Sequence, residues 1–139
     1  MDLYAENILE HYRNPRNKWV VGSGQWVVTH TEKNPTCGDE LTVGLNIKNG
    51  VIKEIAWEGT GCAISQAGMS MLAEELGGKT TDEIDAMKKD NMYTLLGVPI
   101  GPRRFKCALL GLHTLKNAIR KSAKKEPQSW LETVEIDGQ

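Results

Sequence analysis

The chain has 139 residues, of which 17 are Lys or Arg and 18 are Asp or Glu, so its net charge is −1. This length suits one domain with a single core, the balanced charge gives no support to a nucleic-acid-binding protein, and no apolar stretch is long enough to cross a membrane. The N-terminus lacks a secretory signal and the three cysteines are an odd number, so we expect thiols in the cytoplasm rather than a disulfide framework.

The N-terminal half predicts one helix followed by three strands. Helical signals cover residues 2–14, and β-branched residues favour a first strand at 26–31. Strict alternation of apolar residues predicts a second strand at 40–48. The Asn-Gly pair at 49–50 is a strong hairpin signal and leads into a return strand at 51–58. We therefore expect a small three-stranded antiparallel sheet.

The C-terminal half predicts helices. The expected elements are a helix at 64–76, a short helix at 80–89 that begins with a capping box, a connecting loop at 90–102, a long helix at 103–125 and a tail at 129–139. Strands followed by helices favour an α+β fold in which the helices pack on one face of the sheet. We expect a single domain over residues 1–139, with the tail at its end.

Each cysteine lies at a junction between elements rather than inside an apolar stripe. Cys37 lies in the loop before the alternating strand, Cys62 at a helix N-terminus, and Cys107 in the first turns of the last helix. A single unpaired cysteine is usually a small core residue, and this alternative stays open for each of them. The surroundings favour thiolates, because a helix N-terminus stabilises an anion at Cys62, and Arg104 and Lys106 place positive charge near Cys107.

Asp39 lies two positions after Cys37, and Gly38 between them lets the loop curl so that both side chains reach one ion. Three thiolates and one carboxylate provide a four-ligand set for zinc or an iron centre. The absence of a Cys-x-x-Cys pair argues against a zinc ribbon or knuckle. We interpret the histidines, His11, His30 and His113, as surface or hydrogen-bonded core residues rather than ligands.

The segment at 103–125 holds eight Lys or Arg and no acid. Its polar face is expected to carry Lys116, Arg120, Lys121, Lys124 and Lys125. The simpler interpretation is a solvated helix face. The alternative is a docking surface for an acidic protein partner.

Several motifs, taken in order, resemble the IscU/SufU-type iron–sulfur cluster assembly scaffold family, also known as the NifU N-terminal domain family. They are His11-Tyr12-Arg13-Asn14-Pro15-Arg16-Asn17, Asn34-Pro35-Thr36-Cys37-Gly38-Asp39, Gly61-Cys62 and Lys106-Cys107. The resemblance covers nearly the whole chain. It implies a compact α+β fold with a metal site formed by Cys37, Cys62 and Cys107, with Asp39 as the fourth group.

The resemblance also implies a function. Family members receive sulfur from a pyridoxal-phosphate cysteine desulfurase, and either assemble a [2Fe–2S] cluster for transfer to apo-proteins or carry sulfur onward as a persulfide. Cys37 lies on the most mobile of the three segments, so we expect any persulfide to form there. Asp39 is the weakest ligand for a soft metal, so we expect it to be the point of ligand exchange. We expect Arg104 to hold Asp39 as an ion pair while the site is open, and Lys106 to place positive charge near Cys107.

The subtype is mixed. IscU-type members have His before the last cysteine, where this chain has Lys106, and a chaperone-binding Leu-Pro-Pro-Val-Lys stretch, where this chain has Val98-Pro99-Ile100-Gly101-Pro102. SufU-type members, which often hold zinc, resemble this chain at 61–67 and at 104–107, but usually carry an insertion before the last cysteine that is missing here. The resemblance therefore implies a SufU-like sequence on a scaffold of IscU length.

Three hypotheses follow. The favoured one is a non-enzymatic scaffold that binds iron or a [2Fe–2S] cluster. The alternative is a zinc-dependent sulfur acceptor that activates a cysteine desulfurase, which is a sulfurtransferase role. A purely structural zinc domain is disfavoured, because such sites are closed by four strong ligands and this one would include a carboxylate. We expect a cysteine desulfurase and apo iron–sulfur proteins as partners, no nucleic acid or membrane, and a monomer or weak homo-oligomer.

Overall fold

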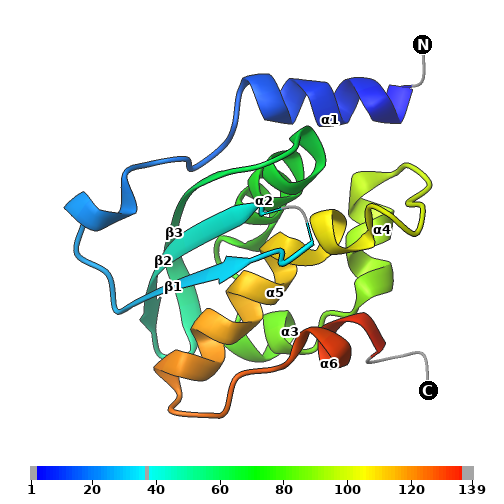
Figure 1. Ribbon diagram of the computed structural model, residues 1–139. Coiled ribbons are helices and arrows are strands. Elements are labelled where there is room, and N and C mark those ends of the chain that lie inside the picture. The colour runs from blue at the N-terminus through cyan, green and yellow to red at the C-terminus, as the bar shows by residue number, and fades with distance from the viewer. Residues whose placement is uncertain (1–2, 37, 136–139) are drawn as a thin grey trace.

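The structure, a computed structural model, describes residues 3–36 and 38–135 (Figure 1). Its elements are α1 (Leu3–Arg13), the 3-10 turn η1 (Val21–Ser23), β1 (Val28–Lys33), β2 (Glu40–Lys48), β3 (Val51–Thr60), α2 (Ala63–Leu76), α3 (Thr81–Asp85), α4 (Lys89–Leu96), α5 (Phe105–Ser122) and α6 (Trp130–Glu135). The α+β architecture expected from the sequence is confirmed. Within the described ranges, no helix is both long enough and apolar enough to cross a bilayer.

The sheet has the strand order β1-β2-β3, and both neighbouring pairs are antiparallel. Its alternating residues Leu41, Val43 and Leu45 are fully buried, as the pattern predicts. Asn49 and Gly50 both have positive φ, 54° and 73°, which the favoured two-residue hairpin turn requires. Local sequence therefore sets the β2–β3 hairpin directly.

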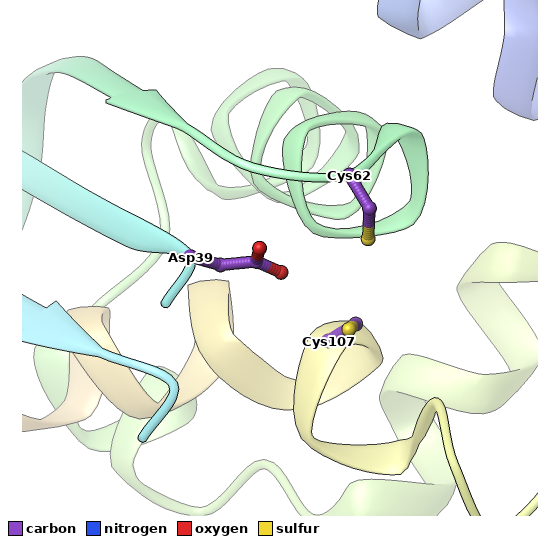
Figure 2. Close-up of side chains that lie close together, drawn as sticks. All are labelled: Asp39, Cys62 and Cys107. Carbon is purple, nitrogen blue, oxygen red and sulfur yellow. The ribbon is translucent and has the colours of Figure 1, made fainter. Parts of the chain in front are cut away.

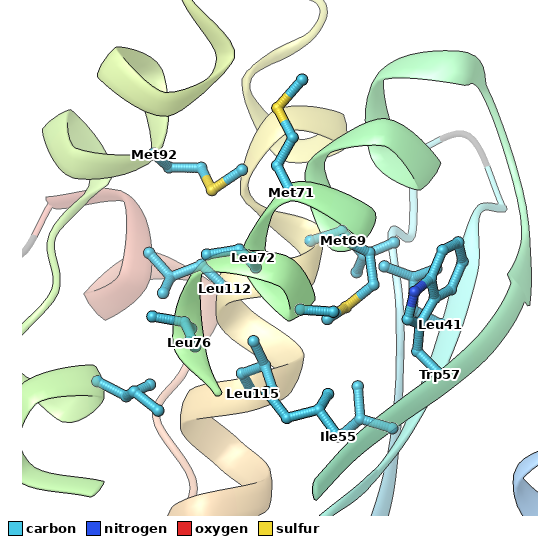
Figure 3. Close-up of a cluster of buried hydrophobic side chains, with 14 of the residues drawn as sticks. Leu41, Ile55, Trp57, Met69, Met71, Leu72, Leu76, Met92, Leu112 and Leu115 are labelled. Carbon is cyan, nitrogen blue, oxygen red and sulfur yellow. The ribbon is translucent and has the colours of Figure 1, made fainter. Parts of the chain in front are cut away.

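Helices α2 and α5 cover one face of this sheet and enclose the core with it (Figure 3). Leu72 of α2 and Leu112 of α5 belong to the same buried cluster as Leu41 and Trp57 of the sheet. The two helices approach closely at Gly111, where an added Cβ would lie 3.2 Å from the Leu72 side chain. The expected packing of helices on one face is confirmed.

Residues 89–96 form α4, where the sequence predicts part of a connecting loop. The backbone N–H of Lys88 donates to Asn91 Oδ1 (2.7 Å) before the helix, and Gly97, with φ of 75°, ends it. Met92 and Leu96 are fully buried. The loop prediction is wrong here because the helix is held by its end residues and two core contacts rather than by a long apolar stripe.

Residues 130–135 form α6, where the sequence predicts a tail. Ser129 and Glu132 form a reciprocal cap, in which each backbone N–H donates to the other side chain at 2.9 and 3.1 Å. The Trp130 ring stacks on His113 of α5, with centroids 4.1 Å apart. This contact orders the segment, and a local pattern does not reveal it.

The polar face predicted for α5 needs one correction. Lys116 is only 1% exposed, and its ammonium donates to the Met87 carbonyl. Burial lowers the pKa of the Lys116 amine. Arg120 lies 3.5 Å from an Asp85 oxygen. The basic surface of this helix end is therefore limited to Lys121, Lys124 and Lys125, which are exposed.

Candidate metal site

Asp39, Cys62 and Cys107 come together at one end of the sheet (Figure 2). Asp39 directly precedes β2, Cys62 is the N-cap of α2 just after β3, and Cys107 lies in the first turn of α5. Glu40 at the start of β2 pairs with Thr60 at the end of β3, which brings the first two elements side by side. One carboxylate oxygen and the two sulfurs all lie within 4.8 Å of one another.

Cys37, the fourth predicted ligand, lies outside the described residues. Beside it, Gly38 has φ of 80°, a conformation that favours glycine. The Asn34 N–H donates to the Asp39 carbonyl and the Gly38 N–H donates to the Asn34 carbonyl, both at 2.8 Å. These bonds hold Asn34 beside Gly38 and Asp39, where the end of β1 lies next to the start of β2.

Gly61 lets the Asp39 carboxyl group approach the backbone between β3 and α2. Its φ is 151°, and an added Cβ would lie 2.8 Å from both Asp39 Cγ and Ser65 Oγ. Real Cβ atoms do not approach that closely, so a larger residue would displace the carboxylate from Cys62. In the sequence, Gly61 stands out only through the family resemblance, and no local pattern reveals this steric role.

Asp39 is 5% exposed, and its buried Oδ2 atom has no hydrogen-bond partner among the described residues. A buried charge without a partner is costly to fold. A cation held between this oxygen and the two sulfurs would remove that cost. The mixed thiolate and carboxylate donors fit zinc or iron, and the oxygen is the more exchangeable donor.

Cys62 is the N-cap residue of α2, at the helix N-terminus where the sequence places it. Its sulfur is 3.8 Å from Ser65 Oγ, to which the thiol form donates. The Ser65 hydroxyl in turn donates to the Cys62 carbonyl at 3.1 Å. These contacts hold the first turn of α2 around the sulfur.

Asn34 contacts the site, although it is not among the site residues predicted from the sequence. Its side chain is completely buried, and Nδ2 donates to Cys107 Sγ at 3.6 Å. Its Oδ1 accepts from the Thr36 N–H at 3.0 Å. The available sequence signal was the Asn-Pro-Thr turn before Cys37, because Asn side chains commonly accept a backbone N–H two residues on.

Arg104 and Lys106 lie beside Cys107 at the N-terminus of α5. Arg104 is the exposed N-cap residue, whereas Lys106 is half-buried with its ammonium 6.0 Å from the Phe105 ring centroid. In the described part of the chain, neither forms an ion pair with Asp39. Both are close to Cys107 in sequence, and their functional roles stay predictions.

The three histidines do not join this group. Their ring contacts are His11 with Ser70 (2.8 Å), His30 with Glu32 (2.7 Å) and His113 with Thr133 (2.6 Å). Burial lowers the pKa of His11 and of His113. These are the hydrogen-bonded core or surface positions expected for lone histidines.

Comparison with known proteins identifies the family of this chain. Residues 3–129 match the model of the NifU-like N terminal domain. The chain is 30% identical to the zinc-dependent sulfurtransferase SufU of Bacillus subtilis, over 86% of this chain and 90% of the relative. It is 31% identical to the iron–sulfur cluster assembly scaffold protein IscU of Thermotoga maritima, over 86% and 94%.

A solved structure shares the fold as well. The N-terminal NifU-like protein of Brucella abortus superposes with a TM-score of 0.73 at 27% identity, over 89% of this chain and 96% of that one. The family match, the two curated relatives and the fold therefore agree. The chain belongs to the NifU-like N-terminal domain family.

Proposed function

We propose that this protein is an iron–sulfur cluster assembly scaffold. It accepts sulfur from a cysteine desulfurase, holds iron or a [2Fe–2S] cluster as cargo, and passes the cluster to apo-proteins. The observation that carries this proposal is the convergence of Asp39, Cys62 and Cys107 around an unpartnered, buried carboxylate oxygen. The similarity to a relative named as an IscU scaffold supports it.

In this function the site residues have different roles. Cys62 and Cys107 supply thiolates from rigid helix ends, and Cys37 supplies the third. Asp39 supplies the exchangeable oxygen, so that the site opens at one ligand without releasing the others. The positive charge of Arg104 and Lys106, which are close to Cys107 in sequence, favours anionic sulfur species.

Sulfur enters through Cys37 in this proposal. Its thiolate attacks the outer sulfur of the desulfurase persulfide, the sulfur–sulfur bond breaks, and the desulfurase thiolate leaves. The neighbouring Gly38 is exposed and has positive φ, and these two features support the proposal that sulfur from a partner enters here. Mass spectrometry after incubation with desulfurase and cysteine should find the added sulfur on Cys37. A persulfide found only on Cys107 contradicts this route.

The second candidate is a zinc-dependent sulfurtransferase that activates the desulfurase. Lys106 occupies the position before the last cysteine, and a relative with 30% identity carries this activity in its name. The same residues would then hold zinc as a resident ion. The two candidate functions use the same site and differ in what it holds, which is iron or a [2Fe–2S] cluster for transfer in the first and a resident zinc ion in the second.

Anaerobic reconstitution with ferrous iron, cysteine and a cysteine desulfurase separates them. The scaffold function predicts cluster absorption bands, stoichiometric acid-labile sulfide and transfer of both to an apo-ferredoxin. The sulfurtransferase function predicts one tightly bound zinc per chain, no cluster, and desulfurase stimulation that is lost when zinc is removed. Asp85→Asn is a suitable control variant, because Asp85 lies outside the site and should leave either outcome unchanged.

We propose that the desulfurase docks partly on the basic surface of Lys121, Lys124 and Lys125. Reversing the charge at Lys124 and Lys125 should slow association and reduce its salt dependence. The free energy of unfolding should change by less than about 0.5 kcal/mol, because both side chains are exposed. The exposed Lys48 and Lys53, reversed together, provide the matched control. Equal association rates for both double variants at low salt contradict this surface.

We also place the protein in the cytoplasm as a monomer or weak homo-oligomer. Cys62 and Cys107 are thiols, which suits a reducing compartment. Sedimentation of the metal-free and metal-loaded protein measures the oligomeric state.

A further inference from the structure

Asn34 is the polar side chain that joins the β1–β2 turn to a sulfur of the site. It is 0% exposed, although asparagine is normally a surface residue. Buried polar groups are retained where they are hydrogen-bonded. The two ends of the Asn34 carboxamide are used differently, and this difference indicates what the residue does.

The carbonyl end of the side chain shapes the turn. Oδ1 accepts from the Thr36 N–H at 3.0 Å, while the Asn34 backbone bonds to Gly38 and Asp39 at 2.8 Å each. These three hydrogen bonds lie within six successive residues and set the course of the chain from β1 into Asp39. Two of these bonds are backbone–backbone, and the third needs only an acceptor at the position of Asn34 Oδ1, which an Asp side chain also provides.

The amide end serves a distant residue. Nδ2 donates to Cys107 Sγ at 3.6 Å, across 73 positions of sequence. An N–H donor stabilises negative charge on sulfur and orients its lone pairs, and such outer contacts tune metal ligands. Cys107 is itself 2% exposed, so water contributes little at its sulfur.

We propose that Asn34 is a positioning residue of the metal site. Its N–H···S bond holds the Cys107 sulfur in ligand orientation and reduces the sulfur's electron donation to the metal, while its carbonyl holds the turn that precedes Asp39. The proposal rests on the metal-binding function proposed above. It predicts that Asn34 slows metal release, an effect that its structural role in the turn does not explain.

Asn34→Asp separates the two ends, because the carboxylate keeps an acceptor for Thr36 and loses the donor to Cys107. Asn117→Asp is the matched control. Asn117 is also buried, its Oδ1 accepts the Gln128 N–H at 2.7 Å, and its Nδ2 donates to Glu32 at 2.9 Å, away from the site. Both substitutions therefore bury a new carboxylate, and only one removes a donor from a sulfur.

Both variants are loaded with Co²⁺, whose sulfur-to-metal charge-transfer bands report on the thiolates. Asn34→Asp should move these bands to lower energy, because the sulfur donates more electron density once the N–H donor is gone. It should also speed metal release to a chelator by about 10-fold or more, because the sulfur is no longer held in ligand orientation. Asn117→Asp should match the wild type in both measurements, even if its melting temperature falls. Unchanged bands in Asn34→Asp, or equally accelerated release in both variants, overturn the proposal.

A measurement on the wild-type protein covers the case in which Asn34→Asp does not fold. With ¹¹³Cd bound, NMR should show scalar coupling between cadmium and one Asn34 side-chain amide proton, transmitted through the N–H···S bond. Absence of this coupling in cadmium-loaded protein overturns the inference and leaves the proposed function standing. Failure of the wild-type protein to bind cobalt, cadmium, zinc or iron at all overturns both.

Discussion

Two groups of buried polar side chains lie along α5, and they differ in how their bonding capacity is used. The metal site at the first turn of α5 contains Asp39, Cys62 and Cys107. The second group, the α5 polar cluster, lies farther along the helix and consists of Glu32, His113, Asn117, Gln128 and Thr133. It is held together by hydrogen bonds of 2.6 to 3.0 Å and by a contact of 3.5 Å between His113 Nε2 and a Glu32 oxygen.

The α5 polar cluster is almost saturated. Only the neutral Gln128 Oε1 lacks a partner there among the described atoms, and the one acid, Glu32, is shared by His30, His113 and Asn117. In the metal site it is a carboxylate oxygen, Asp39 Oδ2, that has no partner. Buried polarity alone therefore does not mark a functional site. An unsatisfied buried charge beside soft donors does.

The largest expected effect is on metal binding when a sulfur is removed. Cys62→Ser should weaken binding by more than the roughly 10- to 100-fold that loss of an outer contact costs, because Ser is a poor ligand for a soft metal. Competition with a chromophoric chelator measures this. Ser65→Ala, which changes the same turn without removing a ligand, should retain the metal. A metal content equal to that of the wild type in Cys62→Ser would contradict the three-thiolate site.

The α5 polar cluster should respond in the opposite way. His113→Ala loses the Thr133 bond, the Glu32 contact and the Trp130 stacking, so the free energy of unfolding should fall by about 2–4 kcal/mol. Metal content per folded chain should not change. Urea unfolding and metal analysis test both statements, with the exposed Leu131→Ala on α6 as control. Loss of metal at unchanged stability would remove the distinction between the two groups.

Removing the unsatisfied charge should stabilise the metal-free protein. Asp39→Ala should raise its free energy of unfolding by about 1–2 kcal/mol, because a buried group without a partner is deleted. Urea unfolding of the metal-free protein measures this change.

The same variant tests the role of Asp39 in ligand exchange. Asp39→Ala should still bind metal through the three thiolates, and its cluster should persist longer and transfer more slowly to an apo-ferredoxin. Decay of cluster absorption measures both rates. Faster loss than in the wild type would make Asp39 a structural ligand and exclude the release role.

The smallest effect is a pH dependence carried by the α5 polar cluster. Burial lowers the pKa of His113 in the folded state, below the ordinary value of 6.5. At pH values between the folded-state pKa and 6.5, the unfolded chain binds more protons than the folded chain. The stabilisation that neutral, buried His113 contributes is therefore fully present above pH 6.5 and is lost as the pH falls through the folded-state pKa. The urea midpoint of the metal-free protein should decrease as the pH is lowered from about 7.5 to about 5.5. His113→Gln should reduce this dependence of the midpoint on pH. Equal slopes would show that another group titrates.

Local patterns predicted those parts of the fold that depend on neighbouring residues. The hairpin at Asn49-Gly50 needs only two positive φ values, and the capping box of Thr80 with Glu83 begins α3 where expected. Helices α4 and α6 escaped prediction because they are short and are ordered by distant contacts, those of the buried Met92 and of the partly buried Trp130. The buried Lys116 was misplaced on the polar face because only a carbonyl from another segment, Met87, explains its position.

The sequence by itself determined which residues of the candidate site to consider, since Cys62 and Cys107 stand at element junctions and Asp39 follows a glycine turn. Tertiary structure decided that their donor atoms meet, because the ends of β2 and β3 pair and α5 begins beside them. It also decided that Asn34 reaches Cys107 and that Gly61 makes room for Asp39. Such contacts join residues far apart in the chain. A periodic pattern or a short motif encodes only the geometry of its own neighbourhood.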